Sequence, residues 1–146
     1  MGTRSLLLIV LGVIVVASAI MIGIQTFHSV AVKHNEDNVR NDIIMILGKC
    51  QSWHSTPAIL GGGGRDFNQL DFSKLGLDET LPRDGESKFE NLNGFYTLYI
   101  VDQNRVQVKG QLKEDESRFL HYEMTAHPKL DIYLTSDIAN ETGNEG

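Results

Sequence analysis

Two residues with metal-binding side chains, Cys50 and His54, lie four positions apart in a segment expected to be helical. This spacing places both side chains on one face of a helix, where a thiolate and an imidazole can share a metal ion. A closed zinc site takes four such ligands, and the sequence offers no second Cys/His pair with matching spacing. Cys50 also falls on an apolar stripe of that helix, which favours the role of a small buried hydrophobe. We therefore predict no metal site and no cofactor.

A run of four glycines, residues 61–64, invites a second chemical role, as the cradle of a phosphate group. A P-loop requires Gly-Lys-Ser/Thr, whereas this run is followed by Arg65, Asp66 and Phe67. A tight or flexible connection with positive φ values is the simpler interpretation. The acidic residues are scattered through expected turns, and the sequence contains no serine-centred elbow and no paired carboxylates. The chain is therefore predicted not to be an enzyme.

Composition excludes one further class of function. The chain of 146 residues has a formal net charge of −6, and no stripe of lysines and arginines offsets it. Proteins that bind nucleic acid need such a basic surface to neutralise phosphates, so nucleic acid is not an expected partner. Cys50 is the only cysteine, which makes a disulfide within the chain impossible.

The elements that position these residues begin with residues 6–24, which contain no charged side chain. As a helix, these 19 residues would be about 29 Å long, close to the thickness of a bilayer's hydrocarbon core. We predict a transmembrane segment over residues 1–27, with the lipid bilayer as a partner. A cleaved signal peptide is the alternative, with Arg4 before the apolar run and Ala-Ser-Ala at residues 17–19 as the cleavage site. Cleavage there would leave an apolar start to the mature chain at Ile20.

Small residues in this segment predict close contact between helices. Ala19 and Gly23 form a small-xxx-small pair, and Gly12 adds another low-profile position. Such residues let helices approach closely in lipid, although glycine and alanine are also common in membrane helices in general. We predict that Gly12, Ala19 and Gly23 pack against neighbouring copies of the chain. Basic residues lie on both sides of the segment and do not decide its orientation; the simple signal-anchor arrangement puts the N-terminus in the cytoplasm.

A second helical pattern follows the apolar segment without any glycine or proline before Gly48. Its apolar residues recur in steps of three or four and define one helical face. They are Val39, Ile43, Ile46 or Leu47, Cys50 and Trp53. We predict that Val39, Ile43, Leu47, Cys50 and Trp53 form the core between this helix and a sheet. The helix should end near Pro57, and a weakened zone is expected at residues 34–38, where the stripe lapses.

The C-terminal third has the pattern of an antiparallel meander. Apolar and polar residues alternate in most of four segments, which predicts strands with one buried face. The segments are residues 95–101, 106–112, 120–126 and 130–135. Gly110 is expected to be a weak point or a bulge, and residues 67–94 to be a loop-rich passage with short strands or turns. The predicted domains are residues 28–136, the amphipathic helix with its sheet, and residues 137–146, a polar flexible tail.

This layout resembles the type IV pilin and pseudopilin superfamily of bacteria. The matching parts are Met1-Gly2, residues 6–24, residues 39–53, the glycine-rich loop and residues 95–135. The resemblance implies an α+β fold, in which a long N-terminal helix is first transmembrane and then amphipathic. The amphipathic part packs on a small antiparallel sheet of about four strands. It also implies a structural subunit that self-associates through its N-terminal helix into a type IV pilus filament or a type II secretion pseudopilus.

The chain departs from the superfamily near its N-terminus. Prepilins are cut after a glycine that usually follows basic residues, and the mature chain generally has glutamate as its fifth residue. Cleavage after Gly2 would make Thr3 the first residue and Leu7 the fifth, and Arg4 follows the glycine. We therefore predict a degenerate pilin-like subunit, in the membrane or in an extracellular filament. The alternative is a single-pass membrane protein with a monomeric extracytoplasmic binding domain.

Overall fold

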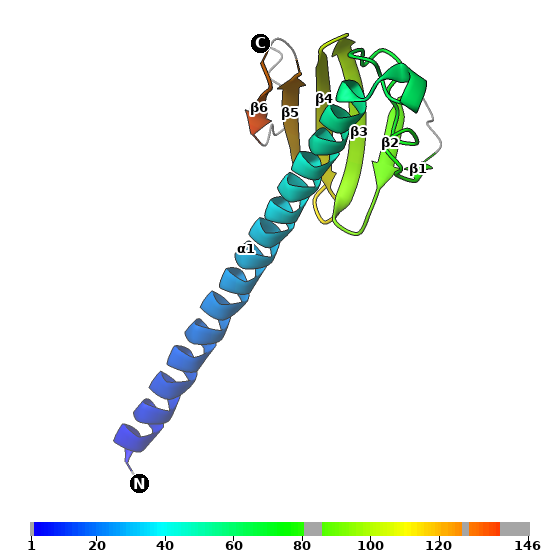
Figure 1. The fold of residues 1–146 in the computed structure, drawn as a ribbon. Helices are drawn as coiled ribbons and strands as arrows, with labels where there is room; N and C mark the ends of the chain where they lie inside the picture. Colours follow the sequence, from blue (N-terminus) through cyan, green and yellow to red (C-terminus); the bar gives the residue numbers. More distant parts are fainter. Residues whose placement is uncertain (1, 81–85, 127–128, 138–146) are drawn as a thin grey trace, which may run out of the picture. The chain divides into compact units, whose positions relative to one another are not determined.

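The computed structural model of the chain describes residues 2–80, 86–126 and 129–137. They form an N-terminal helix and an antiparallel sheet, which is the α+β class predicted from the sequence (Figure 1). The chain divides into two compact units, Met1–His34 and Asn35–Gly146, and each is described here by itself.

Helix α1 runs over Thr3–Ser55, so the weakened zone expected at residues 34–38 is absent. Polar side chains support the helix at this point: Arg40 Nη2 lies 3.3 Å from Glu36 Oε1, one turn away. The helix ends one residue before Thr56, because the ring of a following proline disfavours helical dihedrals in the residue that precedes it. A short 3-10 turn, Ala58–Leu60, follows Pro57.

The sheet has six antiparallel strands in the described residues, and they lie side by side in chain order. Their bounds are β1 Glu79–Thr80, β2 Ser87–Glu90, β3 Gly94–Asp102, β4 Arg105–Leu112, β5 Phe119–Thr125 and β6 Asp131–Asp137. Strands β3 to β6 are the predicted meander. The short strands β1 and β2 lie in the loop-rich passage, where the sequence had not allowed strands to be placed. Of the predicted polar tail, Asp137 ends β6, and residues 138–146 lie outside the described residues.

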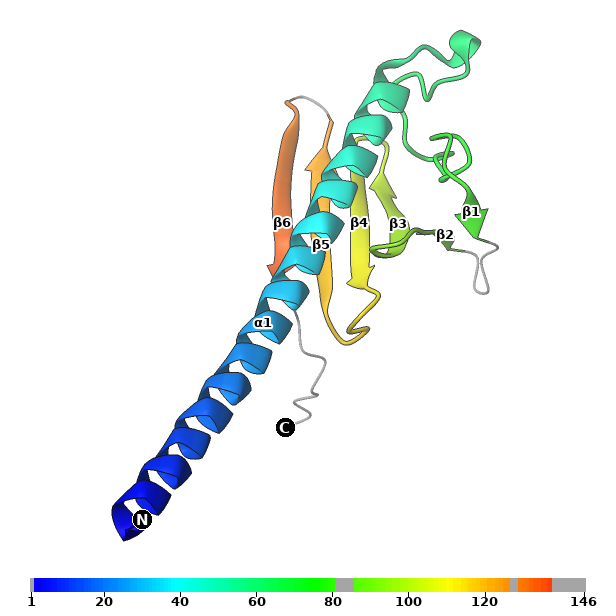
Figure 2. The same cartoon turned by 90° about the horizontal axis from the view of Figure 1, so that it is seen from below.

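Residues 35–55 of α1 lie across one face of the sheet (Figure 2). The core between them draws on this part of α1, on residues 67–75 and on the inward-facing positions of β3, β4 and β5. Its largest fully buried side chains include Phe67, Phe72 and Tyr96. The opposite face of the sheet carries most of the polar side chains that alternate with this core.

Gly110 was expected to weaken β4 or to form a bulge, and this prediction is wrong. Its pairing with Tyr96 on β3 and Leu120 on β5 is regular. A Cβ atom at Gly110 would lie 2.7 Å from Ile43 Cδ1 and 2.8 Å from Val39 Cγ1. The glycine therefore leaves the room in which Val39 and Ile43 of α1 pack on the sheet. The irregularities in pairing lie between Ile100 and Asp102 and between His121 and Tyr122.

Strand β6 buries less than its alternating pattern predicts. Ile132 lies opposite the buried Met124 but is 40% exposed, and Leu130 is 47% exposed. Only Leu134 of the three apolar residues packs against the core. Because β6 is the last strand of the sheet, the buried cluster reaches it at one position instead of along its length.

Candidate functional site

The first candidate site is the apolar part of α1. It is long and apolar enough to cross a membrane, and none of its most apolar window is buried. Leu6, Ile14 and Ile22, for example, are each more than half exposed. In water, such a surface would be unfavourable by about 1.5–3 kcal/mol for each large aliphatic side chain left uncovered. The surface of this part of α1 is therefore of the kind that suits the interior of a bilayer.

The predicted packing residues share one face of α1. Ala19 and Gly23 follow Gly12 by seven and eleven positions, close to two and three helical turns. A Cβ atom added at Gly12 or at Gly23 would meet no atom of residues 2–34 within 4 Å. Gly12 also lines a shallow apolar depression on the helix surface with Ile9 and Val16, whereas Ala19 and Gly23 do not.

Residues 2–34 give these helical glycines no packing partner. Glycine in the interior of a helix is about 1 kcal/mol less favourable than alanine, and it leaves room for another group to approach the helix closely. At Gly110 the approaching atoms belong to Val39 and Ile43. At Gly12 and Gly23 no atom of residues 2–34 uses the space, and at Gly48 no atom of the described residues lies within 4 Å either.

The predicted residues of the helix–sheet core are on the inner face of α1. Val39, Ile43, Leu47 and Cys50 are fully buried, and Trp53 is partly buried against the cluster. Burial raises the pKa of the Cys50 thiol to about 12, so the sulfur is protonated at neutral pH. A protonated thiol is a poor metal ligand and a poor nucleophile.

His54, the second of the two residues at metal-ligand spacing, is also buried. Its ring packs on Phe67 with the centroids 4.4 Å apart, and its Nε2 atom has no hydrogen-bond partner in the described residues. Within residues 2–80, 86–126 and 129–137, no group of three or more His, Cys, Asp or Glu side chains is placed to hold a metal ion.

The four glycines form a compact end to α1. The amides of Gly63, Gly64 and Arg65 donate to the carbonyls of Trp53, Thr56 and His54, at 2.8–2.9 Å. Gly61 and Gly64 have φ values of 85° and 61°, the positive values expected for a tight connection. Because three of the loop's amides satisfy carbonyls at the end of the helix, they are not available to a phosphate group.

The loop also requires glycine because a side chain at two of its positions would not fit. A Cβ atom at Gly62 would lie 2.3 Å from the Thr56 carbonyl oxygen, and one at Gly63 would lie 2.3 Å from the Trp53 ring. Both distances are far inside van der Waals contact. The run of glycines therefore has a structural role, because it turns the chain tightly back over the last turn of the helix.

Asp42 holds the helix to the turn between β2 and β3. Its Oδ2 atom accepts hydrogen bonds from Asn91 Nδ2 at 2.8 Å, Asn93 Nδ2 at 2.7 Å and the Tyr96 hydroxyl at 2.7 Å. Burial alone would raise the pKa of Asp42, but the three hydrogen bonds outweigh it and hold the pKa below the usual range of an aspartate. Burial and the contact with Asp42 raise the pKa of Tyr96.

Sequence reasoning missed Asp42, because it lies off the apolar stripe and an off-stripe aspartate is usually solvated. Its partners are 49 to 54 positions away in the chain. The one local signal is Asn91, whose Oδ1 accepts hydrogen bonds from the amides of Asn93 and Gly94 and so forms the turn.

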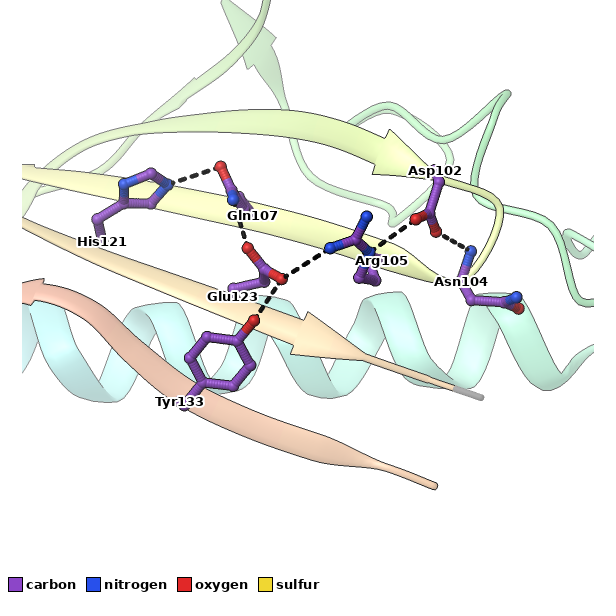
Figure 3. Close-up of polar contacts among 7 residues, drawn as sticks. All are labelled: Asp102, Asn104, Arg105, Gln107, His121, Glu123 and Tyr133. Carbon is purple, nitrogen blue, oxygen red and sulfur yellow. Dashed lines mark hydrogen bonds and ion pairs between the residues drawn. The ribbon is translucent and has the colours of Figure 1, made fainter. Parts of the chain in front are cut away.

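Glu123 is the centre of a polar network on the sheet face turned away from residues 35–55 of α1 (Figure 3). It is 6% exposed, and its carboxylate accepts hydrogen bonds from Tyr133 on β6 and Gln107 on β4. Arg105 Nη1 lies 3.7 Å from the same carboxylate, and Arg105 Nε lies 2.7 Å from Asp102 Oδ2. The network therefore joins side chains from four consecutive strands, β3 to β6.

The ionised state of Glu123 suits a role in holding neighbouring strands together through hydrogen bonds. The hydrogen bonds from Tyr133 and Gln107 lower the pKa of Glu123, so the carboxylate is ionised at neutral pH and is a weak base. His121 Nε2 lies 3.1 Å from Gln107 Oε1, and burial and the Lys109 ammonium lower the pKa of its imidazole. With its oxygens engaged by β4 and β6, Glu123 ties the edge strand to the sheet.

No protein-family model, curated protein or solved structure matches this chain. The assignment of a function therefore depends on the chain's own residues and geometry.

Proposed function

We propose that the chain is a membrane-anchored, pilin-like structural subunit that assembles through the N-terminal part of α1 into a filament or pseudopilus. The apolar segment lies in the bilayer before assembly and packs against the same segment of neighbouring copies afterwards. The unit of residues 35–146 lies outside the cytoplasm. No catalytic step, metal or cofactor is required, because the function consists of packing.

One observation carries this proposal: Gly12 and Gly23 lie on one apolar face of α1, and a Cβ atom at either position would meet no atom of residues 2–34 within 4 Å. Between helices in lipid, van der Waals packing replaces the hydrophobic effect as a driving force, and small residues allow backbones to approach. The layout of α1 against an antiparallel sheet adds support, because the pilin superfamily shares it.

Cysteine cross-linking in native membranes tests the proposal. In a Cys50→Ala background, which removes the one native thiol, Ala19→Cys should form disulfide-linked dimers under mild oxidation. Met21→Cys is the matched control, because it lies two positions further on, on the opposite side of the helix. We expect the yield of dimer to be about tenfold lower for the control, because its thiol faces away from the contact.

Two outcomes of this experiment contradict assembly through this face. The absence of dimers from Ala19→Cys would favour the monomeric anchor with an extracytoplasmic binding domain. Equal yields from Ala19→Cys and Met21→Cys would indicate random collisions in the membrane instead of a defined helix contact.

A further inference from the structure

A groove lies on the sheet face turned away from residues 35–55 of α1, and assembly does not account for it. Its volume is about 390 Å³, and it runs over β2, β3 and β4. Phe95, Thr97 and Tyr99 of β3 lie along it and alternate with the inward-facing Tyr96 and Leu98. This volume lies at the small end of the range for sites that bind small molecules, about 300–1,000 Å³.

The charges along the groove cancel. Its lining includes two acidic and two basic side chains, Glu86, Glu90, Lys88 and Lys109. Lys88 Nζ lies 3.6 Å from Glu86 Oε2, and Glu90 Oε1 lies 2.6 Å from the Nζ atom of nearby Lys113. Because each acid has a lysine beside it, the groove offers donors and acceptors of hydrogen bonds without a net charge. This balance favours an uncharged polar ligand over an ion.

The groove has an aromatic ring near each end of β3, with a hydroxyl group between them. Phe95 and Tyr99 lie four residues apart on one face of the strand, a separation of about 13 Å. The Lys113 ammonium lies 5.5 Å from the centroid of the Phe95 ring and covers that end. The Tyr99 ring is partly exposed. The centroid of the neighbouring His121 ring lies 6.4 Å from that of Tyr99, and the two ring planes are tilted by 56°. Tyr99 is therefore the ring open to a ligand.

A peptide cannot bind along β3 as an added strand. β3 pairs with β2 on one side and with β4 on the other, so its backbone amides and carbonyls are used within the sheet. Strand addition requires a free edge. Recognition in the groove must therefore come from side chains, namely one open aromatic ring, the Thr97 hydroxyl, the Gln111 side-chain oxygen and the charged groups of the lining. The Gln111 side-chain nitrogen already donates to the Glu116 carbonyl.

We propose that this groove binds a neutral saccharide, with one sugar ring against Tyr99 and its hydroxyl groups on Thr97, Gln111 and the Lys88–Glu86 pair. The C–H faces of a sugar ring pack on an aromatic face, while its hydroxyl groups both donate and accept hydrogen bonds. The combination of an aromatic platform with donors and acceptors of balanced charge matches both properties. The site is independent of assembly through α1, because all its lining residues belong to the sheet or lie beside β2.

The test uses the full chain in a zwitterionic detergent, because detergents with sugar headgroups would compete for the groove. The probes are maltose, cellobiose and N,N′-diacetylchitobiose at millimolar concentrations. Binding is followed through the backbone amide resonances of Thr97, Tyr99 and Gln111. We expect saturable shifts at these amides with at least one of the three disaccharides.

Tyr99→Ala should weaken that binding about tenfold, which corresponds to about 1.4 kcal/mol. Val101→Ala is the control, since Val101 is an exposed residue further along the same strand but outside the groove. It should leave the affinity within about twofold. Thermal melting of both variants checks that the fold is intact.

Three results would overturn the proposal. They are the absence of groove shifts with all three disaccharides, an unchanged affinity in a folded Tyr99→Ala variant, and tighter binding of an anionic probe, glucuronate, or of a short neutral peptide. None of these results bears on the cross-linking of Ala19→Cys, so the two proposals fail separately.

Discussion

Asp42→Ala is expected to destabilise the unit of residues 35–146 by about 2–4 kcal/mol. Asp42 accepts three hydrogen bonds, and its loss leaves the hydroxyl of the fully buried Tyr96 without its acceptor. A buried polar group without a partner costs about 1–3 kcal/mol, and hydrogen bonds to a charged acceptor are stronger than neutral ones. Urea unfolding of the full chain in detergent, followed by the fluorescence of Trp53, measures the change.

Asp37→Ala is the control for this variant. Asp37 lies on the same helix five positions earlier, but its side chain is exposed. Its removal should change the free energy of unfolding by less than about 0.5 kcal/mol. Similar effects from the two substitutions would show that Asp42 contributes no more than an ordinary surface carboxylate.

The effect of Asp42 should also depend on pH. Its pKa in the folded chain lies below that of an aspartate in the unfolded chain, so its stabilising contribution is fully present at pH values well above the unfolded-state pKa. This contribution is lost as the pH falls through the folded-state pKa, because the carboxylate must then be protonated. The difference in stability between the wild-type chain and Asp42→Ala should therefore shrink as the pH falls through this acidic range.

Replacing both Gly12 and Gly23 with leucine should abolish most helix-mediated assembly. A Cβ atom at either position meets no atom of residues 2–34 within 4 Å, so leucine there fits this unit and would be felt by a helix packed against it. Two leucines would hold two helices apart and remove the close backbone packing that small residues permit. We expect the yield of Ala19→Cys dimers in native membranes to fall about tenfold, which corresponds to about 1.4 kcal/mol of lost association.

The matched control is Ile14→Leu, on the side of α1 opposite Gly12. It keeps the volume of the side chain, and the dimer yield should stay at the parent level. Urea unfolding followed by Trp53 should be the same in all three chains, since none of the substitutions lies in the unit of residues 35–146. An undiminished dimer yield in the double variant would contradict packing through the glycine face.

Periodic burial explains which parts of the fold could be predicted from the sequence. The inner face of α1 repeats every three to four residues and β4 alternates strictly, so both could be placed without a structure. Strands β1 and β2 are only two and four residues long, too short to show a period. The position of β6 was predicted correctly from its alternating residues. Its side chains are more exposed than that alternation predicts, because the extent of the core depends on packing across the whole sheet.

The polar contacts could not be predicted because they join distant parts of the chain. Asp42 and Tyr96 are 54 positions apart, and Gln107 and Glu123 are 16 apart on neighbouring strands. Neither carboxylate differs from a solvated one in its local sequence. Gly110 was misjudged for the same reason: its missing side chain makes room for Val39 and Ile43, which lie about seventy positions earlier.

The mature N-terminus of the protein extracted from membranes tests the central claim most directly, and intact-mass measurement determines it. Assembly through α1 requires that Gly12, Ala19 and Gly23 all remain in the working protein. Such assembly therefore predicts a mature N-terminus that lies before Gly12, and a start at Thr3 would add direct support for pilin-type processing. A chain that begins at Ile20 would lack Gly12 and Ala19 and would contradict the account.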